Sequence, residues 1–423
     1  MPESTLLNRL IDKGVNLPDA NAVHIGHEVD VERIGDQGVT LYPGCRITGA
    51  STWIGQGAQL GAEGPVTIDN CRIGPDVRLK GGFFNKAVFL ENASMGSGAH
   101  VREGTILEEQ ASGAHCVGLK QTILFPYVTL GSLINFCDCL MAGGTGRKNH
   151  GEVGSSYIHF NFTPNQDKAT ASLIGDVPKG VMLDQPPVFL GGQGGLVGPC
   201  RIAFGTVIAA GSIYRKDVTE PGRLVFEGSP RGGSAPFVPG LYRSVKRTVI
   251  NNIVFIANLI ALAAWYRHVR ALFIGERFSQ ALWKGLLENV YLAIDERIKR
   301  LAELATQMPL SISLSASGEG SDGVLRQKQA LCQHWDRVQG LLIGLKALRT
   351  DGRDQDLFLE KIDASISVKG KDYLDTICGL DSGTKAIGTR WLQGIVDTVV
   401  GEVSRVWPVF FDPSASSTRD EAC

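Results

Sequence analysis

One histidine of this chain has the chemistry of a general base. His115 lies in the sequence SGAHCVGLK, within a long glycine-rich region. A neutral imidazole is the side chain that most often takes a proton near neutral pH. We therefore select His115 as the candidate catalytic residue, with an ordinary surface histidine as the alternative.

A short basic stretch further along the chain has the chemistry of an anion site. The sequence GGTGRKNH (143–150) places Arg147 and Lys148 between glycines and a histidine. Two cations and the main-chain amides of a glycine-rich loop suit a phosphate group. We expect Arg147 and Lys148 to bind a sugar phosphate, a nucleotide sugar or the diphosphate of CoA. An exposed basic turn is the alternative.

The cysteines and histidines do not form a metal-binding motif. Cys137 and Cys139 make a single Cys-x-Cys pair, which is too sparse for a zinc site. The histidines between residues 100 and 159 are separated by nine residues or more, unlike the close pairs of zinc enzymes. We expect no metal cofactor.

The scaffold that must position these residues has a six-residue repeat. Apolar residues occupy every sixth position from Leu190 to Tyr214, and small residues fill most of the gaps. Such hexapeptides are typical of a left-handed parallel β-helix, in which three short sides make one coil and the apolar residues point inward. At about 18 residues a coil, we predict roughly ten coils. Earlier blocks keep the same spacing: Leu41–Ile47, Ile54–Leu60–Val66, Ile73–Leu79, Met95–Val101–Leu107 and Leu124–Leu130–Phe136.

These patterns divide the chain into four consecutive parts. We predict an N-terminal cap (1–21), a mainly β left-handed parallel β-helix (22–227), a linker rich in Gly, Pro and Ser (228–240) and an α-helical C-terminal domain (241–423). Residues 131–160 break the six-residue rhythm. We expect them to form a loop inserted into the rod, where functional residues often lie.

The C-terminal domain shows the periodicity of amphipathic helices. Residues 283–305, 325–349 and 389–407 each repeat apolar positions at helical spacing, so we predict one helix for each range. The polar and glycine-containing stretch 308–323 predicts a flexible loop.

One apolar run in this domain approaches the length of a membrane span. It extends from Val249 to Tyr266 but contains Asn251, Asn252 and Asn258, each of which is costly in lipid. We predict a buried helix and no membrane association. A net charge of −1 gives no indication of a nucleic-acid partner. Nine scattered cysteines, and a first segment unlike a signal peptide, predict a cytoplasmic protein with reduced thiols.

Two tracts of the rod resemble a known family. They are GSSYIHFNFTPNQDKATASLIGDV (154–177) and VFLGGQGGLVGPCRIAFGTVIAAGSIYRKDV (188–218). They resemble the acetyltransferase domain of the bacterial bifunctional UDP-N-acetylglucosamine pyrophosphorylase and glucosamine-1-phosphate N-acetyltransferase. That family ends its rod with a TIAAG…RDV run, which VIAAGSIYRKDV (207–218) matches.

The resemblance extends to individual site residues. The family's Asn-Tyr pair, followed by a lysine-containing loop, is matched by Asn161, Phe162 and Lys168. Its catalytic Gly-His precedes this tract by one coil, and Ala114-His115 is taken as the matching pair.

The resemblance, over residues 95–220, implies an activity and a set of roles. The expected reaction is N-acyl transfer from acetyl-CoA to a phosphorylated amino sugar or a nucleotide amino sugar, without a covalent intermediate, in a homotrimer. His115 would be the general base, and Asn161 and Lys168 would hold the acceptor. The groove for acetyl-CoA would be lined by Gly192, Ala209 and Ala210.

Three positions depart from the family pattern and leave a second hypothesis open. Gly118 replaces an aromatic hydroxyl, Phe162 replaces the tyrosine, and Gly192 replaces a serine. The nucleotidyltransferase half of the family has no match in this sequence, so we expect no pyrophosphorylase activity. The alternative function is a non-catalytic, sugar-nucleotide-binding scaffold with a helical assembly domain.

Overall fold

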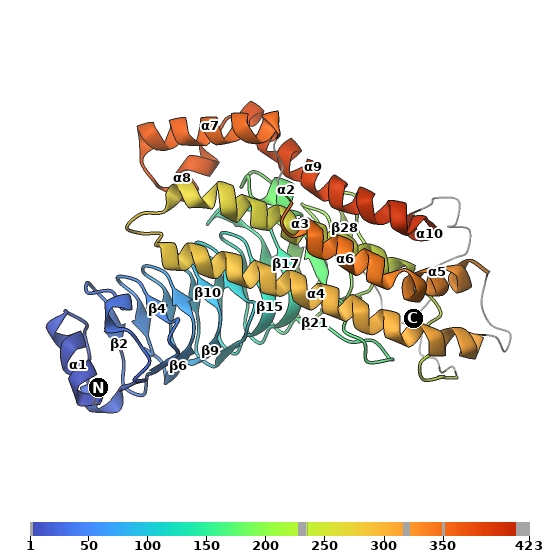
Figure 1. Cartoon of the computed structure of the whole chain (residues 1–423). Coiled ribbons are helices and arrows are strands. Elements are labelled where there is room, and N and C mark those ends of the chain that lie inside the picture. Colours follow the sequence, from blue (N-terminus) through green and yellow to red (C-terminus); the bar gives the residue numbers. More distant parts are fainter. Residues whose placement is uncertain (1–2, 227–233, 235, 316–321, 349–351, 412–423) are drawn as a thin grey trace.

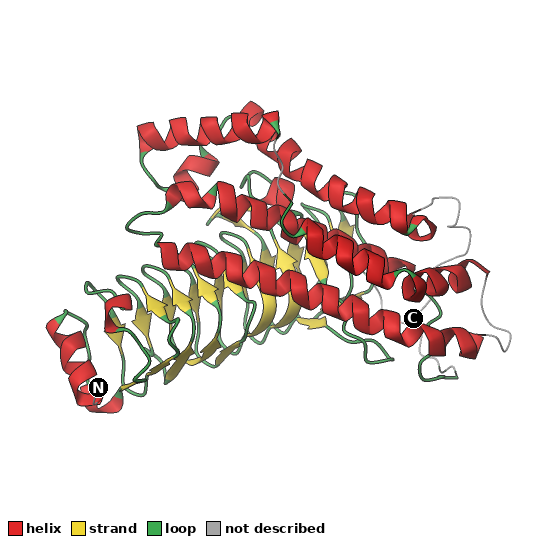
Figure 2. Cartoon of the chain, in the orientation of Figure 1, coloured by secondary structure: helices red, strands yellow, loops and turns green. Residues whose placement is uncertain are grey.

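The computed structural model describes residues 3–226, 234, 236–315, 322–348 and 352–411. Helix α1 (Glu3–Asp12) lies at one end of a long rod of short parallel strands, and a layer of helices runs along the rod (Figures 1 and 2). The left-handed parallel β-helix followed by helices, predicted from the hexapeptides, is confirmed. The predicted linker, 228–240, lies mostly outside the described residues.

The rod has three faces, which we name A, B and C. Face A stacks ten strands, and the rod has about 11 turns, close to the roughly ten coils predicted. Its strands are β2 (Thr40–Leu41), β5 (Gln59–Leu60), β8 (Arg78–Leu79), β11 (Ser94–Met95), β14 (Ser112–Gly113), β16 (Thr129–Leu130), β20 (Glu152–Val153), β23 (Phe189–Leu190), β26 (Val207–Ile208) and β28 (Leu224–Val225).

Faces B and C are joined by two long strands, β15 (Gly118–Leu124) and β17 (Asn135–Met141), which begin on face B and end on face C. The other strands of face B are β1 (His24–Ile25), β3 (Arg46–Thr48), β6 (Val66–Asp69), β9 (Gly82–Asn85), β12 (Ala99–Val101), β21 (Ile158–Phe160), β24 (Gly195–Val197) and β27 (Ile213–Tyr214). The others of face C are β4 (Trp53–Ile54), β7 (Arg72–Ile73), β10 (Val88–Phe89), β13 (Ile106–Leu107), β22 (Ser172–Ile174) and β25 (Arg201–Ile202).

The hexapeptide pattern forms this rod because strand side chains alternate between the interior and the surface. On face B, successive coils place Ile68, Phe84, Val101, Leu119 and Phe136 inside, each at most 2% exposed. Main-chain hydrogen bonds between coils hold the strands, and stacked apolar side chains fill the interior.

The expected inserted loop at 131–160 is wrong in most of its length. This segment contains β17, β20 and β21, so it supplies nearly a full coil of the rod. Only a short hairpin leaves the rod, made of β18 (Gly144–Gly146) and β19 (Asn149–His150). The larger excursions come later: residues 161–171 lie between β21 and β22, and residues 175–188, with the short helix α2 (Val177–Gly180), lie between β22 and β23.

The predicted buried helix over the apolar run is α3 (Lys246–His268). By length and composition it could cross a membrane, but 83% of its most apolar window is buried inside the protein. Its asparagines bond to the rod: Asn251 donates to Asp217 (2.9 Å) and Asn252 to the Ala169 carbonyl (2.8 Å), while Asn258 accepts from the Val177 amide (2.9 Å). These bonds explain why polar groups occur in an otherwise apolar helix.

The helix α4 (Gln280–Ser315) packs along face C beside α3. Gly285 permits the close approach, since a Cβ there would meet the Arg72 side chain at 2.7 Å. The predicted loop at 308–323 is wrong at its start, because α4 continues through Pro309. Buried contacts of Met308 and Ser311 hold this last part of the helix.

An outer helical layer covers α3. The single helix expected at 325–349 is instead two helices, which separate at His334, where Trp335 turns to pack against Trp407 with ring centroids 6.1 Å apart. The sequence patterns also missed a helix at Arg353–Lys369. The outer elements are η3 (Arg270–Phe273), α5 (Asp322–Gln333), α6 (Trp335–Leu345), α7 (Arg353–Lys369), α8 (Tyr373–Cys378), α9 (Ser382–Val406) and α10 (Pro408–Phe411).

A buried ionic cluster joins the helices to the rod. Arg270, fully buried, pairs with Glu109, and its guanidinium lies 3.7 Å from the ring centroid of Tyr373. Tyr266 donates to the neighbouring Glu108. Burial, with the charge of Glu109, raises the pKa of Glu108 to about 8, which favours its protonated form.

Candidate functional site

The corner between faces A and B carries a column of small and polar residues. Each residue precedes a corner residue of positive φ, for example Cys116 (56°), Leu133 (60°) and Ser156 (61°). The main chain sets the stacking, because the amide of Leu133 donates to the His115 carbonyl and the amide of Ser156 to the Ser132 carbonyl. We name this the corner column: Ser97, His115, Ser132, Ser155, Gly192 and Ala210.

The corner column brings together three of the residues selected from the sequence. His115, Gly192 and Ala210 occupy it, and Ala209 immediately precedes Ala210. Gly192 is required for packing, since a Cβ there would meet the Ser155 carbonyl oxygen at 2.8 Å. Gly192 is half-buried and Ala210 is exposed, so small residues line the surface at this part of the corner.

His115 is exposed, and its ring contacts the next residue of the column. The imidazole Nδ1 lies 2.8 Å from the hydroxyl oxygen of Ser132. The amide of Ser132 in turn donates to the Ser155 hydroxyl at 3.1 Å. Ser132 is the functional candidate that the sequence reasoning missed. The sequence feature that could have identified Ser132 is its position, 17 residues after His115, which is one coil along the rod.

The coil count corrects the match of His115 to the family pattern. Asn161 follows β21, and the residues at the corner one coil earlier are Ser132 and Leu133, which precede β17. His115 precedes β15 and is therefore two coils before β21. Its ring nevertheless reaches the hydroxyl at the one-coil position through the contact with Ser132.

The predicted acceptor residues lie at another corner. The strand β21 crosses face B from Ser156 at one edge to Asn161 at the other. Lys168 lies further along the loop 161–171, where its side chain is exposed and its carbonyl accepts a hydrogen bond from Arg297 (3.3 Å). Face B therefore separates Asn161 and Lys168 from His115 within one chain.

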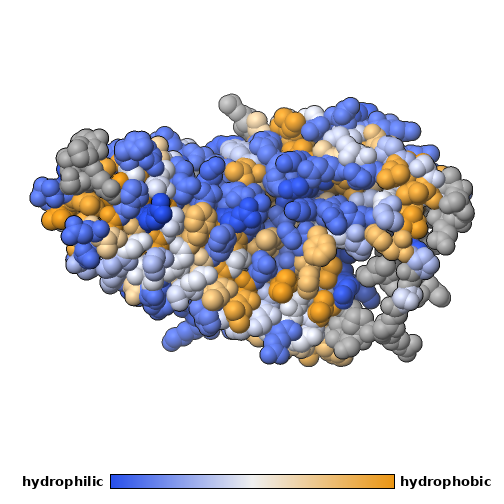
Figure 3. Space-filling view, turned by 90° about the horizontal axis from the view of Figure 1, so that it is seen from below, coloured by the Kyte–Doolittle hydropathy of each residue, from blue (hydrophilic) through white to orange (hydrophobic). Residues whose placement is uncertain are grey.

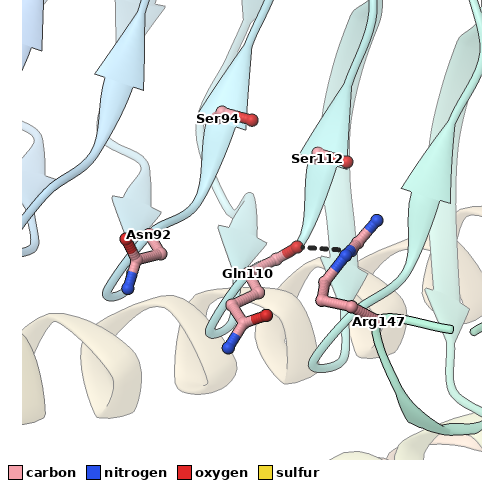
Figure 4. A pocket seen from close by; sticks show the side chains of 5 residues that line it. All are labelled: Asn92, Ser94, Gln110, Ser112 and Arg147. Atoms are coloured by element: carbon pink, nitrogen blue, oxygen red, sulfur yellow. Dashed lines mark hydrogen bonds between the residues drawn. The ribbon is translucent and has the colours of Figure 1, made fainter.

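Arg147 and Lys148 lie in the hairpin at the corner between faces C and A. Arg147 folds back on the rod and donates to the carbonyls of Gln110 and Tyr127 and to the Thr129 hydroxyl, each at 2.9 Å. Lys148 is exposed. The arginine closes one end of a shallow polar groove that continues along the rod (Figure 4). The groove is lined by Asn92, Ser94, Gln110, Ser112 and Arg147.

A second histidine of this region belongs to the interior. His159 is buried in β21, and its Nε2 lies 2.8 Å from the Ser172 hydroxyl. Burial lowers its pKa to about 4, so it is neutral at physiological pH. In the part of the chain that the structure describes, no three His, Cys, Asp or Glu side chains gather as a metal site would require. No disulfide joins any of the eight cysteines that the structure describes.

Known proteins resemble about half of this chain. A "Bifunctional protein GlmU" of Thermotoga maritima is 26% identical over 213 residues, which are 50% of this chain and 42% of the relative. A protein of the same name from Pelobacter propionicus is 30% identical over 233 residues, 53% of this chain and 44% of the relative. The chain thus spans less than half the length of these curated relatives. No family model matches the chain. The resemblance to the bifunctional family, inferred from motifs, is confirmed.

Proposed function

We propose that the protein is an acetyl-CoA-dependent N-acyltransferase that acts at the corner column. The acceptor is a phosphorylated amino sugar or a nucleotide amino sugar. The observation that carries this proposal is the alignment of His115, Ser132, Gly192 and Ala210 on one corner of the rod. The similarity to GlmU proteins supports the same class of reaction.

The pair of His115 and Ser132 supports a role as general base. With the Nδ1 proton donated to the Ser132 hydroxyl oxygen, the lone pair on Nε2 is free to accept a proton. The acceptor amine attacks the thioester carbonyl carbon, the C–S bond breaks, and His115 passes the amine proton to the leaving CoA thiolate. No bond between acetyl group and enzyme forms in this sequence.

The small residues of the corner column suit the thioester end of the cofactor. Gly192, Ala209 and Ala210 expose main chain where a long, narrow molecule can lie close. The acceptor residues Asn161 and Lys168 lie across face B, so we propose that they reach the column of a second copy in a homotrimer. Exposed apolar side chains occur along face B at Phe83, Ile158 and Ile213. The view from below shows apolar groups scattered among polar ones (Figure 3).

The basic hairpin remains a proposed anion site. Arg147 is held by neutral oxygen atoms, so its positive charge is available to a phosphate in the groove beside Ser112. Lys148 adds a second, flexible cation. This groove lies at the opposite edge of face A from His115. We propose that it takes the phosphate end of an extended ligand such as CoA or a nucleotide sugar.

A non-catalytic scaffold is the second candidate function. It is favoured by the coil count, because Ser132 and Leu133 occupy the one-coil position that the family gives to its catalytic pair. Gly118 and Phe162 favour it as well, since both lack the hydroxyl of the family pattern. In that case the rod binds a sugar nucleotide without turnover. Under either function we propose a cytoplasmic protein without pyrophosphorylase activity.

One experiment separates the two functions. Release of CoA from acetyl-CoA is measured by mass spectrometry with glucosamine 1-phosphate and with nucleotide amino sugars as acceptors. The first function predicts turnover with at least one acceptor and a loss of about 10²–10⁴-fold in His115→Ala. The scaffold predicts saturable binding of a sugar nucleotide and no turnover in either protein.

A further inference from the structure

The loop 161–171, which carries Asn161 and Lys168, is held at three points by the helical domain. Asn165 uses both ends of its amide: the Gly240 amide donates to its oxygen (2.9 Å), and its nitrogen donates to the Leu241 carbonyl (3.2 Å). Gly240 and Leu241 lie where the linker meets the helical domain, shortly before α3 begins at Lys246. The first attachment therefore ties the tip of the loop to the segment that leads into the helices.

The second and third attachments come from the interior of the helical domain. Asn252 of α3 donates to the Ala169 carbonyl at 2.8 Å. Arg297 of α4 donates to the Lys168 carbonyl at 3.3 Å and to the carboxylate of Asp138 at 2.6 Å. Asn252 and Arg297 are at most 2% exposed. Buried polar groups that lose their partner are costly, so these bonds fix the main chain at 168–169.

Arg297 also connects the loop with the rod. Its partner Asp138 has a positive φ and lies at the bend within β17, the strand that follows Ser132. One guanidinium therefore bonds both to the rod and to the loop that leaves it. The loop contains its own cross-links as well, from Thr163 to Asp167 and from the Ala169 amide to Asp167. With its ends on the rod, its tip on residues 240–241 and residues 168–169 on α3 and α4, the loop has a single defined path.

We propose that the helical domain is a clamp that positions loop 161–171, and so sets the affinity for the acceptor, with Asn165, Asn252 and Arg297 as positioning residues. This inference rests on the proposed function for the part that concerns the acceptor. It assigns a role to a domain that does not supply any residue of the corner column.

The test uses the full-length protein and the variant Asn165→Ala, because Asn165 is a loop residue whose loss leaves the core intact. The matched control is Asn258→Ala, since Asn258 also bonds the rod from the helical domain but contacts Val177, outside the loop. Hydrogen–deuterium exchange is measured by peptide. We expect exchange in 161–171 to rise at least tenfold in Asn165→Ala and to stay at the wild-type level in Asn258→Ala. Asn165→Asp should be intermediate, because it keeps an oxygen that accepts from the Gly240 amide.

The kinetic arm uses acetyl-CoA with glucosamine 1-phosphate, or whichever amino sugar supports turnover. We expect Asn165→Ala to raise KM for the acceptor about tenfold or more, with kcat and KM for acetyl-CoA within twofold of the wild type. Unchanged exchange in 161–171 overturns the clamp, whether or not the protein is an enzyme. Raised exchange with an unchanged acceptor KM overturns the role of the loop in acceptor binding. If no acceptor is turned over, the proposed function fails, and the exchange data alone decide whether the clamp exists.

Discussion

The Nδ1 atom of His115 lies 2.8 Å from the hydroxyl oxygen of Ser132, although 17 residues separate them in sequence. The two residues stand on neighbouring coils of one corner, where the amide of Leu133 bonds to the His115 carbonyl. This contact orients the ring of an exposed histidine.

The substitution Ser132→Ala should slow the reaction without abolishing it. A typical hydrogen bond contributes about 1 kcal/mol, so its loss from the oriented ring predicts a decrease in kcat of about fivefold. Release of CoA measures the change. Ser367→Ala, which removes an exposed hydroxyl from α7, outside the rod, should keep the wild-type rate. Equal rates in both variants would show that Ser132 does not orient His115.

Stability should depend on pH through Glu108. Its pKa is about 8 in the folded protein and near 4.5 in the unfolded chain, so between these values only the folded state binds the proton. The free energy of unfolding therefore falls as pH rises from 5 to 8, by at most about 1.4 kcal/mol per pH unit from this group. Above pH 8 this contribution is lost.

The variant Glu108→Gln isolates this effect. It keeps a neutral side chain beside Tyr266, and its unfolding free energy in urea should decline less steeply between pH 5 and 8 than that of the wild type. Glu360→Gln, an exposed change in α7, should retain the wild-type slope. Parallel curves for all three proteins would mean that Glu108 is ionised in the folded state.

Removal of Arg270 should strongly destabilise the attachment of the helices. Arg270→Met leaves the carboxylate of Glu109 buried without its partner, which costs roughly 3–5 kcal/mol. Arg277 is the comparison, because it also pairs with carboxylates of the rod, Asp76 and Glu91, but is 53% exposed. Arg277→Met should cost less than about 1 kcal/mol. Chemical denaturation of both variants checks this order, and similar losses would contradict it.

The rod could be predicted from the sequence because its inward-facing positions recur every six residues and mostly carry apolar side chains. Even strands of two or three residues can be located in the sequence by their inward apolar residue, as at Leu190, Leu196, Ile202 and Ile208. The helices were predicted less well. The break at His334 depends on a tertiary contact between Trp335 and Trp407, which no local periodicity reveals.

The position of the proposed base, His115, relative to Asn161 was miscounted for a related reason. The interval from 131 to 160 combines a long strand, β17, with an extruded hairpin, so its length and charge resemble those of one loop. If this interval is treated as a loop, the number of coils between His115 and β21 is one too small. His115 is then placed one coil before Asn161, where the structure has two. The contacts of loop 161–171 with α3 and α4 join residues more than 80 positions apart, which the sequence alone does not indicate.

The central claim is that His115 acts as a base on an amine acceptor. Its most direct test is CoA release from acetyl-CoA by the wild type and by His115→Ala, each shown to be folded by circular dichroism. The account predicts turnover with an amino sugar by the wild type and a loss of about 10²–10⁴-fold in the variant. Equal turnover by both proteins, or no turnover by the wild type with any acceptor of the panel, would contradict it.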